Sequence, residues 1–311
     1  MRRIDAALVG MVLIWGVNYS VIKRAFSEIP PQPFNAIRLV IASAVFLGAI
    51  AYARRRARRG AGAVSSVFFT SSPVTARDWF DLAWLGLIGH CGYQFCFVGG
   101  VNQTSVSNAA LIIGATPVGV AVISAALGRE RITALHWLGA AISITGLYFV
   151  VGHGAEFGGK TFRGDLLILA SVSCWTIYTL GASRLIERHS PLYVTGMTMA
   201  LGMVPYVAMT IPEIVATDWS HLSAFVWISL VLSALLALNV AYLTWYTGVQ
   251  KIGPARTSMY SNLVPIVAMS VAAIWLGEPL GAQKLIGAAA VLTGVLLTRL
   301  GRKPTSIPIE E

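Results

Sequence analysis

Polar and aromatic side chains recur at helical spacing inside long apolar stretches of this 311-residue chain. Residues three, four or seven positions apart share one face of a helix. The candidates placed in this way, or one turn before a proline, are Trp15, Asn18, Tyr19, His90, Tyr93, Gln94, Trp175, Tyr178, Asn239, Tyr242, Trp245 and Asn262. Uncharged amides, hydroxyls and rings suit a small zwitterion or an aromatic amphiphile. We therefore predict that they line a substrate-binding cavity, although interfacial aromatic belts are an alternative for the rings.

His90 is the only histidine well inside an apolar stretch. The sequence offers no second ligand at a metal-binding spacing from it, so we predict no metal site. His90 can bind substrate, titrate, or serve as a hydrogen-bonded interior residue. The three cysteines also fall in apolar stretches and give no disulfide framework. Since no Ser/His/Asp set and no phosphate-binding loop is evident, we predict no catalytic residues, no cofactor and no enzyme.

The elements that position these residues must be membrane helices. The chain is 56% hydrophobic and only 12% charged, whereas soluble domains carry about 25% charged residues. Ten continuous apolar blocks approach or exceed the length of about 17–25 residues that crosses a bilayer. They are residues 6–26, 33–53, 79–100, 105–127, 133–151, 165–186, 191–211, 222–247, 255–276 and 280–299. We predict an all-α membrane protein with ten transmembrane helices.

The basic residues indicate the orientation of these helices. With both termini cytoplasmic, 17 Lys and Arg residues fall on the cytoplasmic side and five on the other. Such a bias predicts that both termini are indeed cytoplasmic. The arginine run at 54–59 belongs to a basic linker, 54–77, which we expect to lie at anionic headgroups rather than to bind nucleic acid.

The chain contains an internal repeat. An offset of 160 aligns Asp5, Trp15, Arg24 and Pro31 with Asp165, Trp175, Arg184 and Pro191. An offset of 148 aligns Trp79, Gly100, Pro117, Glu130, Gly139 and Gly146 with Trp227, Gly248, Pro265, Glu278, Gly287 and Gly294. The offsets differ by about twelve residues, which we place in the linker. Five spans per half is an odd number, so the second half must be inverted. Inverted repeats are a recurrent basis for alternating access, which favours a transporter.

The duplicated Pro-(x12)-Glu-(x8)-Gly-(x6)-Gly pattern, together with Pro33-x4-Arg38, resembles EamA-type proteins of the drug/metabolite transporter superfamily. The resemblance covers essentially the whole chain and implies two five-helix EamA-like repeats, 1–152 and 153–300, with a cytoplasmic tail at 301–311. It extends to the YddG-like exporters of aromatic and other neutral amino acids, which implies that His90 and Tyr93 recognise substrate. It favours a structural role for Arg38 over binding of a substrate carboxylate.

Proline and glutamate positions add predictions about movement and coupling. Pro117 and Pro265 fall mid-span, where a kink makes them candidate gating points. Glu130 and Glu278 end equivalent spans, where a structural role is expected. All thirteen carboxylates lie at span ends, in loops or in the tail, whereas proton- or sodium-coupled carriers usually need an acidic group at membrane depth.

We therefore expect a facilitative secondary transporter that exports small neutral metabolites, amino acids including aromatic ones, by alternating access. Export of other metabolites or drugs, or proton-linked transport through His90, are the alternatives. Exchange of phosphorylated compounds would need several buried basic residues, and the spans contain only Arg38 away from their edges. The expected partners are a small-molecule substrate and the lipid bilayer, with no nucleic acid, and the sequence is compatible with a monomer. We expect a multi-pass protein of the bacterial inner membrane.

Overall fold

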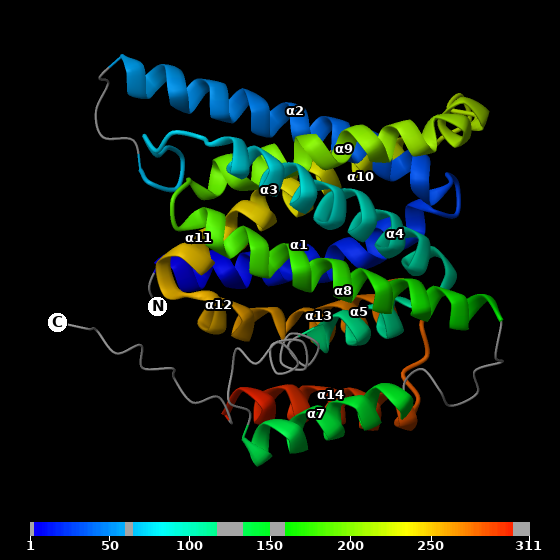
Figure 1. The fold of residues 1–311 in the computed structure, drawn as a ribbon. Helices are drawn as coiled ribbons and strands as arrows, with labels where there is room; N and C mark the ends of the chain where they lie inside the picture. Colours follow the sequence, from blue (N-terminus) through cyan, green and yellow to red (C-terminus); the bar gives the residue numbers. More distant parts are fainter. Residues whose placement is uncertain (1–2, 60–64, 117–132, 150–158, 301–311) are drawn as a thin grey trace.

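The computed structural model describes residues 3–59, 65–116, 133–149 and 159–300, and within them all regular structure is helical (Figure 1). The first half contains α1 (Arg3–Ala25), α2 (Pro31–Arg58), α3 (Ala76–Gly86), the π-helix η1 (Leu87–Gly92), α4 (Tyr93–Gln103), α5 (Val106–Gly114) and α7 (Ala134–Leu147). The second half contains α8 (Lys160–Ile186), α9 (Pro191–Ala216), α10 (Ala224–Leu232), the π-helix η3 (Ser233–Val240), α11 (Ala241–Ile252), α12 (Pro254–Ser261), α13 (Val264–Trp275) and α14 (Ala282–Leu300).

Six of the described helices are long and apolar enough to cross a membrane. They include two composite spans, Ala76–Gln103 and Ala224–Ile252, each with a π-helical segment in its middle. The other four predicted blocks contain shorter helices in the described residues: α5, α7, α12 with α13, and α14. The sequence thus located ten helical segments, and α2 continues past its predicted end at 53 to Arg58.

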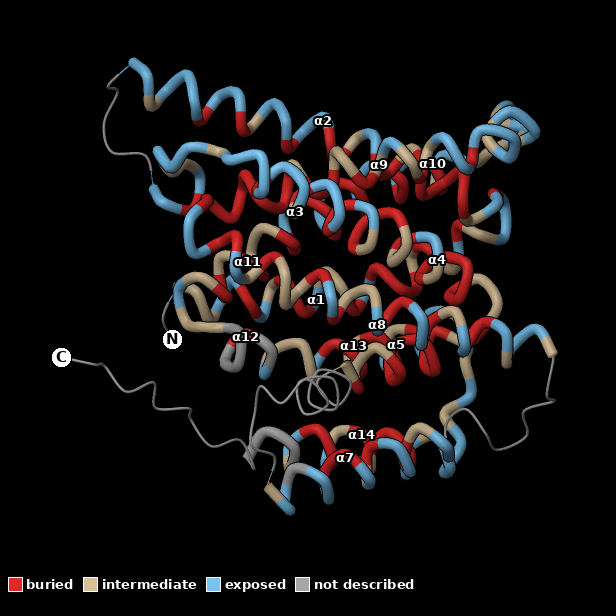
Figure 2. The backbone as a smooth tube through the Cα atoms, in the orientation of Figure 1, coloured by how far each residue is buried: buried red, intermediate tan, exposed pale blue. Residues whose placement is uncertain are grey.

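The outward faces of the bundle carry large apolar side chains. Met209 is 62%, Val215 80% and Ile274 86% exposed, and Figure 2 shows the exposed positions along the outer sides of the helices around a buried interior. A soluble monomer rarely exposes contiguous apolar surface of this kind. Lipid chains satisfy such a surface, so we describe the chain as a multi-pass membrane protein.

Helices from the two halves of the chain interleave. The main contacts are α2 with α9, α4 with α8, α1 with α11 and α13, α5 with α8 and α13, and α7 with α14. In Figure 1, α2 and α9 form the upper edge, α7 and α14 the lower edge, and α1 and α8 lie between them. Each contact joins a helix from the first half to one from the second, so the interior between α1, α4, α8 and α11 belongs to both halves.

Glycines allow the α7–α14 contact to be close. A Cβ atom added at Gly146 would lie 2.8 Å from the Gly287 carbonyl oxygen, and one added at Gly294 would lie 2.5 Å from that of Gly139. Small residues let membrane helices approach until their backbones touch. Packing therefore accounts for the repeated glycines without any further function.

The two π-helical segments occupy matching places in the two composite spans. At the offset of 148, residues 87–92 fall on 235–240, which lie within η3. A π-helix is rare and frequently occurs at functional sites. Periodicity of apolar residues cannot reveal such a segment, and the sequence did not predict it.

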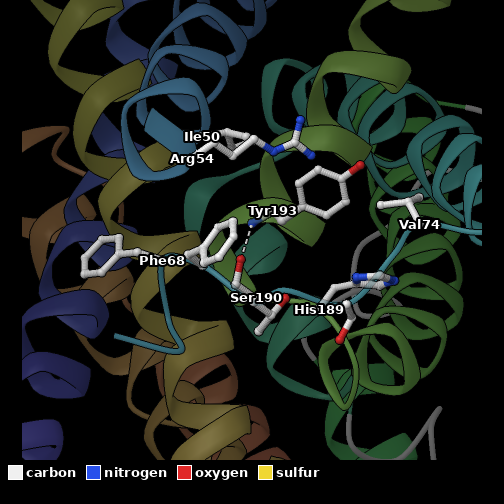
Figure 3. A pocket seen from close by; sticks show the side chains of 10 residues that line it. Ile50, Arg54, Phe68, Val74, His189, Ser190 and Tyr193 are labelled. Carbon is white, nitrogen blue, oxygen red and sulfur yellow. Dashed lines mark hydrogen bonds between the residues drawn. The ribbon is translucent and has the colours of Figure 1, made fainter. Parts of the chain in front are cut away.

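The segment after α2 is fastened to the start of α9. The Leu192 and Ser190 amides donate to the Val67 carbonyl oxygen and to Thr70 Oγ1, both at 3.1 Å. We call these contacts between residues 65–78 and 188–192 the clasp. They enclose a cavity of about 30 Å³, beside which the Arg54 guanidinium lies 5.0 Å from the centre of the Tyr193 ring (Figure 3).

The clasp also holds a buried carboxylate. Asp78 is fully buried, and its carboxylate accepts from the Thr75 amide at 2.9 Å and from Arg188 Nη2 at 2.6 Å. The Thr75 hydroxyl accepts from the Asp78 amide, which completes a capping box. His189 Nε2 lies 3.3 Å from the same carboxylate. A capping box satisfies two amides at the start of α3 that would otherwise have no partner. Part of the predicted basic linker is therefore ordered against the second half.

Candidate functional site

A cluster of aromatic rings lies between α1, α4, α8 and α11. Trp175 of α8 is at its centre, with Tyr93 at 5.2 Å and Trp245 at 6.2 Å between ring centroids. The other rings around Trp175 are Trp15, Tyr178 and Tyr242. The four helices belong to the first, third, sixth and eighth apolar blocks, which carry most of the predicted binding residues. We call these six residues the ring cluster.

Trp15 is anchored in this cluster by both its ring and its indole N–H. Its ring meets those of Trp175 and Tyr242 edge-on, at 6.0 and 5.8 Å. Its Nε1–H donates to the Ala237 carbonyl oxygen of η3 at 3.1 Å. Edge-to-face contacts of this kind contribute beyond their buried area, so Trp15 ties the first span to the π-helical segment of the eighth.

His90 lies in η1 and is fully buried beside the ring cluster. Its Nε2 is 3.1 Å from the Tyr178 hydroxyl and 3.3 Å from Thr198 Oγ1, and those two hydroxyls are 3.0 Å apart. Thr198 donates its own proton to the Val194 carbonyl oxygen at 2.8 Å. A consistent chain of donors therefore runs from His90 Nε2–H to Tyr178, then to Thr198 and the backbone. His90 Nδ1 has no hydrogen-bond partner among the described residues, and in a neutral ring that donates from Nε2 it is a free acceptor.

Other predicted residues join helices around this site. Gln94 Nε2 donates to the Tyr242 hydroxyl at 3.4 Å, which adds Gln94 to the cluster. The Tyr19 ring meets Phe97 edge-on at 5.3 Å. Asn18 accepts from the Ser233 hydroxyl, and Asn239 Nδ2 donates to the Ala42 carbonyl oxygen at 2.9 Å. These two asparagines are therefore engaged in contacts between helices.

The predicted gating residues are only partly described. Pro117 lies outside the described residues. Pro265 opens α13 just after a break in the ninth span, where Asn262 follows the end of α12. A Cβ atom added at Gly114 of α5 would lie 2.6 Å from the Pro265 ring, so the two helices touch at this point. The break is consistent with a hinge, and gating at Pro265 stays a prediction.

Most of the predicted binding residues contact one another. Of the twelve predicted binding residues, Trp15, His90, Tyr93, Gln94, Trp175, Tyr178, Tyr242 and Trp245 form one connected set of ring contacts and hydrogen bonds. Buried polar atoms of this set, including the Gln94 Oε1 and Trp245 Nε1, have no partner among the described residues. Such atoms are costly to bury unless something else bonds to them, which fits a site that a ligand enters by separating the rings.

Two residues near this set were not among the predicted binding residues. Thr198 of α9, which completes the His90 hydrogen-bond chain, carried no signal beyond a hydroxyl in a span. Arg38 of α2 is only 1% exposed and lies within electrostatic range of the Tyr93 and Tyr242 hydroxyls. The spacing of Gln32, Asn35 and Arg38, three residues apart, is the pattern that indicates a polar face on α2.

One end of the bundle is closed by contacts to the turn between α4 and α5. Lys23 Nζ donates to the carbonyl oxygens of Val101, Asn102 and Thr104 at 2.8, 3.0 and 2.7 Å. Asp165 accepts from the Thr104 hydroxyl at 2.5 Å. An ammonium group at the end of α4 satisfies carbonyl groups that have no partner within the helix.

The first turn of α5 is held by Glu278. The carboxylate accepts from the Val106 amide at 2.7 Å and from the amide and hydroxyl of Ser107 at 3.1 and 2.8 Å. A carboxylate at a helix N-terminus satisfies free amides and interacts favourably with the helix dipole. The structure confirms the structural role expected for Glu278, and Glu130 lies outside the described residues.

The opposite end of the bundle has a related contact. Tyr260 of α12 donates its hydroxyl proton to Asp5 Oδ1 at 2.9 Å. Asp5 is the repeat equivalent of Asp165, which bonds to Thr104 and Asn108 in the same manner. At both ends an acidic residue from the first turns of a long helix thus bonds to a short helix or turn of the other half.

Comparison with known proteins agrees with this arrangement. The model of the EamA-like transporter family matches residues 2–152 and again 162–300. The uncharacterized transporter YyaM of Bacillus subtilis (strain 168) is 27% identical over 93% of this chain and 91% of its own length. A probable terminal-alkyne amino-acid exporter of Streptantibioticus cattleyicolor is 27% identical over 73% of this chain and 76% of its own length.

A solved crystal structure shares the fold, with a TM-score of 0.64 and 18% identity over 96% of this chain and 99% of the solved one. At that identity the likeness concerns the fold alone. The two family matches together cover nearly all of the sequence. The chain therefore belongs to the EamA-like transporter family.

Proposed function

We propose that the protein is a facilitative exporter of small neutral metabolites, namely amino acids including aromatic ones. The observation that carries this proposal is the ring cluster around Trp175, which lies at the interface of the two halves, half-buried at Trp15, Tyr93 and Trp175, with unpartnered polar atoms at its edge. Rings can stack on an apolar or aromatic side chain, and the polar atoms can bond to the head groups. A relative named as a probable amino-acid exporter supports the same substrate class.

Transport proceeds by alternating access between two inverted five-helix repeats with both termini cytoplasmic. The two separate matches of the family model support the repeat. So does the exchange symmetry of the contacts: α1 with α12 corresponds to α8 with α5, and α1 with α11 to α8 with α4. α1 begins and α14 ends on the same side of the bundle, as an even number of spans requires (Figure 1). We propose the bacterial inner membrane as the site of this transport.

Within this mechanism His90 binds substrate as a neutral imidazole. Its Nδ1 is the free acceptor at the end of the donor chain through Tyr178 and Thr198. An acceptor beside aromatic rings suits the ammonium group of an amino acid. The competing function is proton-linked export, in which His90 itself would take up and release a proton.

Counterflow in proteoliposomes tests the proposal. Purified protein is reconstituted with a panel of unlabelled neutral amino acids inside, and uptake of a labelled aromatic amino acid is measured. We expect exchange that His90→Ala reduces at least about tenfold, the effect of losing roughly one hydrogen bond to a charged group. His221→Ala, which changes an exposed loop histidine, is the matched control. Wild-type activity in the His90 variant would refute its assignment.

An internal pH dye separates the two coupling modes. Facilitative export predicts that substrate addition leaves the internal pH unchanged when buffer and ionic gradients are absent. Substrate-dependent acidification or alkalinisation that disappears in His90→Ala would establish the proton-linked alternative instead. No exchange of any amino acid by protein shown to be folded would overturn the proposed substrate class.

A further inference from the structure

Arg38 is a buried guanidinium that lacks an ionic partner among the described residues. It is 1% exposed, and none of the described carboxylates lies within 4.0 Å of it. Its Nη1 donates to Asn35 Oδ1 at 2.9 Å, while its Nε has no hydrogen-bond partner there. The Phe34 ring lies 5.8 Å away, close to the outer limit of a cation–π contact.

Its depth in the membrane makes this arrangement costly. Arg38 lies seven residues after Pro31, the first residue of α2, or about 10 Å along the helix axis. An arginine near a helix end can extend its side chain to the interface, where water solvates it. Arg38 instead stays buried in the protein, where an uncompensated charge costs several kcal/mol. Such a site is stabilised by any anion that can reach it.

Polar side chains of α2 and α9 lie near Arg38. Asn35 Nδ2 is a second buried donor without a well-formed hydrogen bond, and it lies near the Tyr206 hydroxyl of α9, which donates to Gln32 Oε1. The hydroxyls of Tyr206, Tyr93 and Tyr242 all lie within electrostatic range of the guanidinium. Tyr93 and Tyr242 belong to the ring cluster. The guanidinium therefore interacts electrostatically with two residues of the ring cluster.

The free donors match one chemical group. A carboxylate accepts two parallel hydrogen bonds from the planar fork of an arginine, and such charge-assisted pairs are about twice as strong as neutral hydrogen bonds. A phosphate could also accept them, but one buried arginine with aromatic neighbours favours a monoanion attached to an apolar or aromatic body. A cationic drug would be repelled by the same charge.

We propose that Arg38, assisted by Asn35, binds the carboxylate of the transported substrate. This rests on the proposed function and narrows it: the substrate class is a monocarboxylate with an aromatic or apolar side chain, such as an α-amino acid, rather than an amine or a neutral drug. It also corrects the expectation of a binding site without fixed charge, and it replaces the purely structural role for Arg38.

The experiment compares each amino acid with its carboxamide. Counterflow of phenylalanine and of phenylalanine amide is measured for wild type, Arg38→Gln, Arg38→Lys and the control Arg55→Gln. Arg55 is exposed on the same helix, so the control removes the same charge outside the site. We expect wild type and Arg55→Gln to prefer the acid at least about tenfold, Arg38→Gln to lose that preference, and Arg38→Lys to keep part of it.

A purely structural arginine would lower transport of both compounds equally. An acid-to-amide ratio in Arg38→Gln equal to that of wild type would therefore overturn the proposal, and so would a wild type without preference. If Arg38→Gln fails to fold, the acid-to-amide transport ratios of wild type and Arg38→Lys test the proposal. A purely structural arginine does not predict that wild type prefers the acid over the amide.

Failure of the proposed function is recognised separately. If wild type exchanges no amino acid, ligand-induced thermal stabilisation of purified wild type and Arg38→Lys is measured with phenylacetate and phenylacetamide. Stabilisation by phenylacetate alone, reduced in Arg38→Lys, supports a carboxylate site without amino-acid transport. Equal or no stabilisation by the two compounds overturns the assignment of Arg38.

Discussion

Replacing Glu278 by glutamine should open the end of the bundle that its carboxylate holds. Glu278 Oε1 accepts from the Val106 amide, and Oε2 accepts from the amide and hydroxyl of Ser107. Glutamine keeps one acceptor oxygen but turns an NH₂ group toward Ser107, so at least one charge-assisted hydrogen bond is lost. That loss costs about 1.5–3 kcal/mol, which corresponds to an increase of roughly 10- to 150-fold in the open fraction.

Thiol labelling measures this fraction. In a background without Cys91, Cys96 and Cys174, Val106→Cys places a thiol of similar size at a fully buried position in the first turn of α5. When opening and closing are fast, the labelling rate is proportional to the open population. We expect Glu278→Gln to raise it within the range above.

The matched control is Glu213→Gln, which neutralises an exposed carboxylate near the end of α9 on the same side of the bundle. Its labelling rate should equal that of the parent. Equal rates for Glu278→Gln and the parent would refute the assignment of Glu278 as the residue that holds this end. Equal acceleration by both variants would show that general loss of negative charge, rather than this contact, controls opening.

Two further predictions concern packing and the clasp. A Cβ atom at Gly202 would lie 2.1 Å from the Gly86 carbonyl oxygen, so Gly202→Ala should lower the free energy of unfolding by about 1–3 kcal/mol. The control is Gly10→Ala, whose Cβ atom meets nothing within 4 Å and should change that free energy by less than about 0.5 kcal/mol. Thermal unfolding in detergent measures both variants, and equal effects would contradict the close approach at Gly202. Asp78→Asn removes the carboxylate that binds Arg188. Proteolysis in the clasp should then accelerate about 5- to 30-fold, which corresponds to a loss of about 1–2 kcal/mol in the free energy of opening the clasp. Asp81→Asn, one turn further along α3, is the control, and similar cleavage of both variants would show that Asp78 does not hold the segment.

Apolar run length and repeat spacing predicted the fold because they reflect the two strongest constraints on the chain. A bilayer requires helices of a minimum length, and glycines at repeated positions mark close contacts such as Gly146 with Gly287. The π-helices were not predictable, since a wide turn such as η1 changes the hydrogen-bond pattern without a characteristic composition.

The site was predictable only in part, because helical spacing gives the face of a helix and not its neighbours. Trp15, Tyr93, Trp175 and Tyr242 were placed together correctly. Asn239 shared their spacing, yet its amide donates to α2. Arg38 was weighed by its distance from the end of a span, whereas its significance depends on α9 and on the tyrosines that face it.

The clasp has an energetic consequence for transport. The first half carries about twelve additional residues before Trp79 and forms the clasp there, whereas the matching segment before Trp227 is held by a hydrogen bond from the Ser223 amide to Glu28, so the two ends of the bundle are fastened unequally. Under the proposed mechanism, the inward-open and outward-open states would have equal free energies if the two halves were identical. The clasp makes these two free energies unequal. Each 1.4 kcal/mol of difference shifts the resting occupancy tenfold. By detailed balance, the substrate gradient alone still sets the direction of net transport. The clasp therefore determines which conformation the empty carrier occupies at rest, and not the direction of transport.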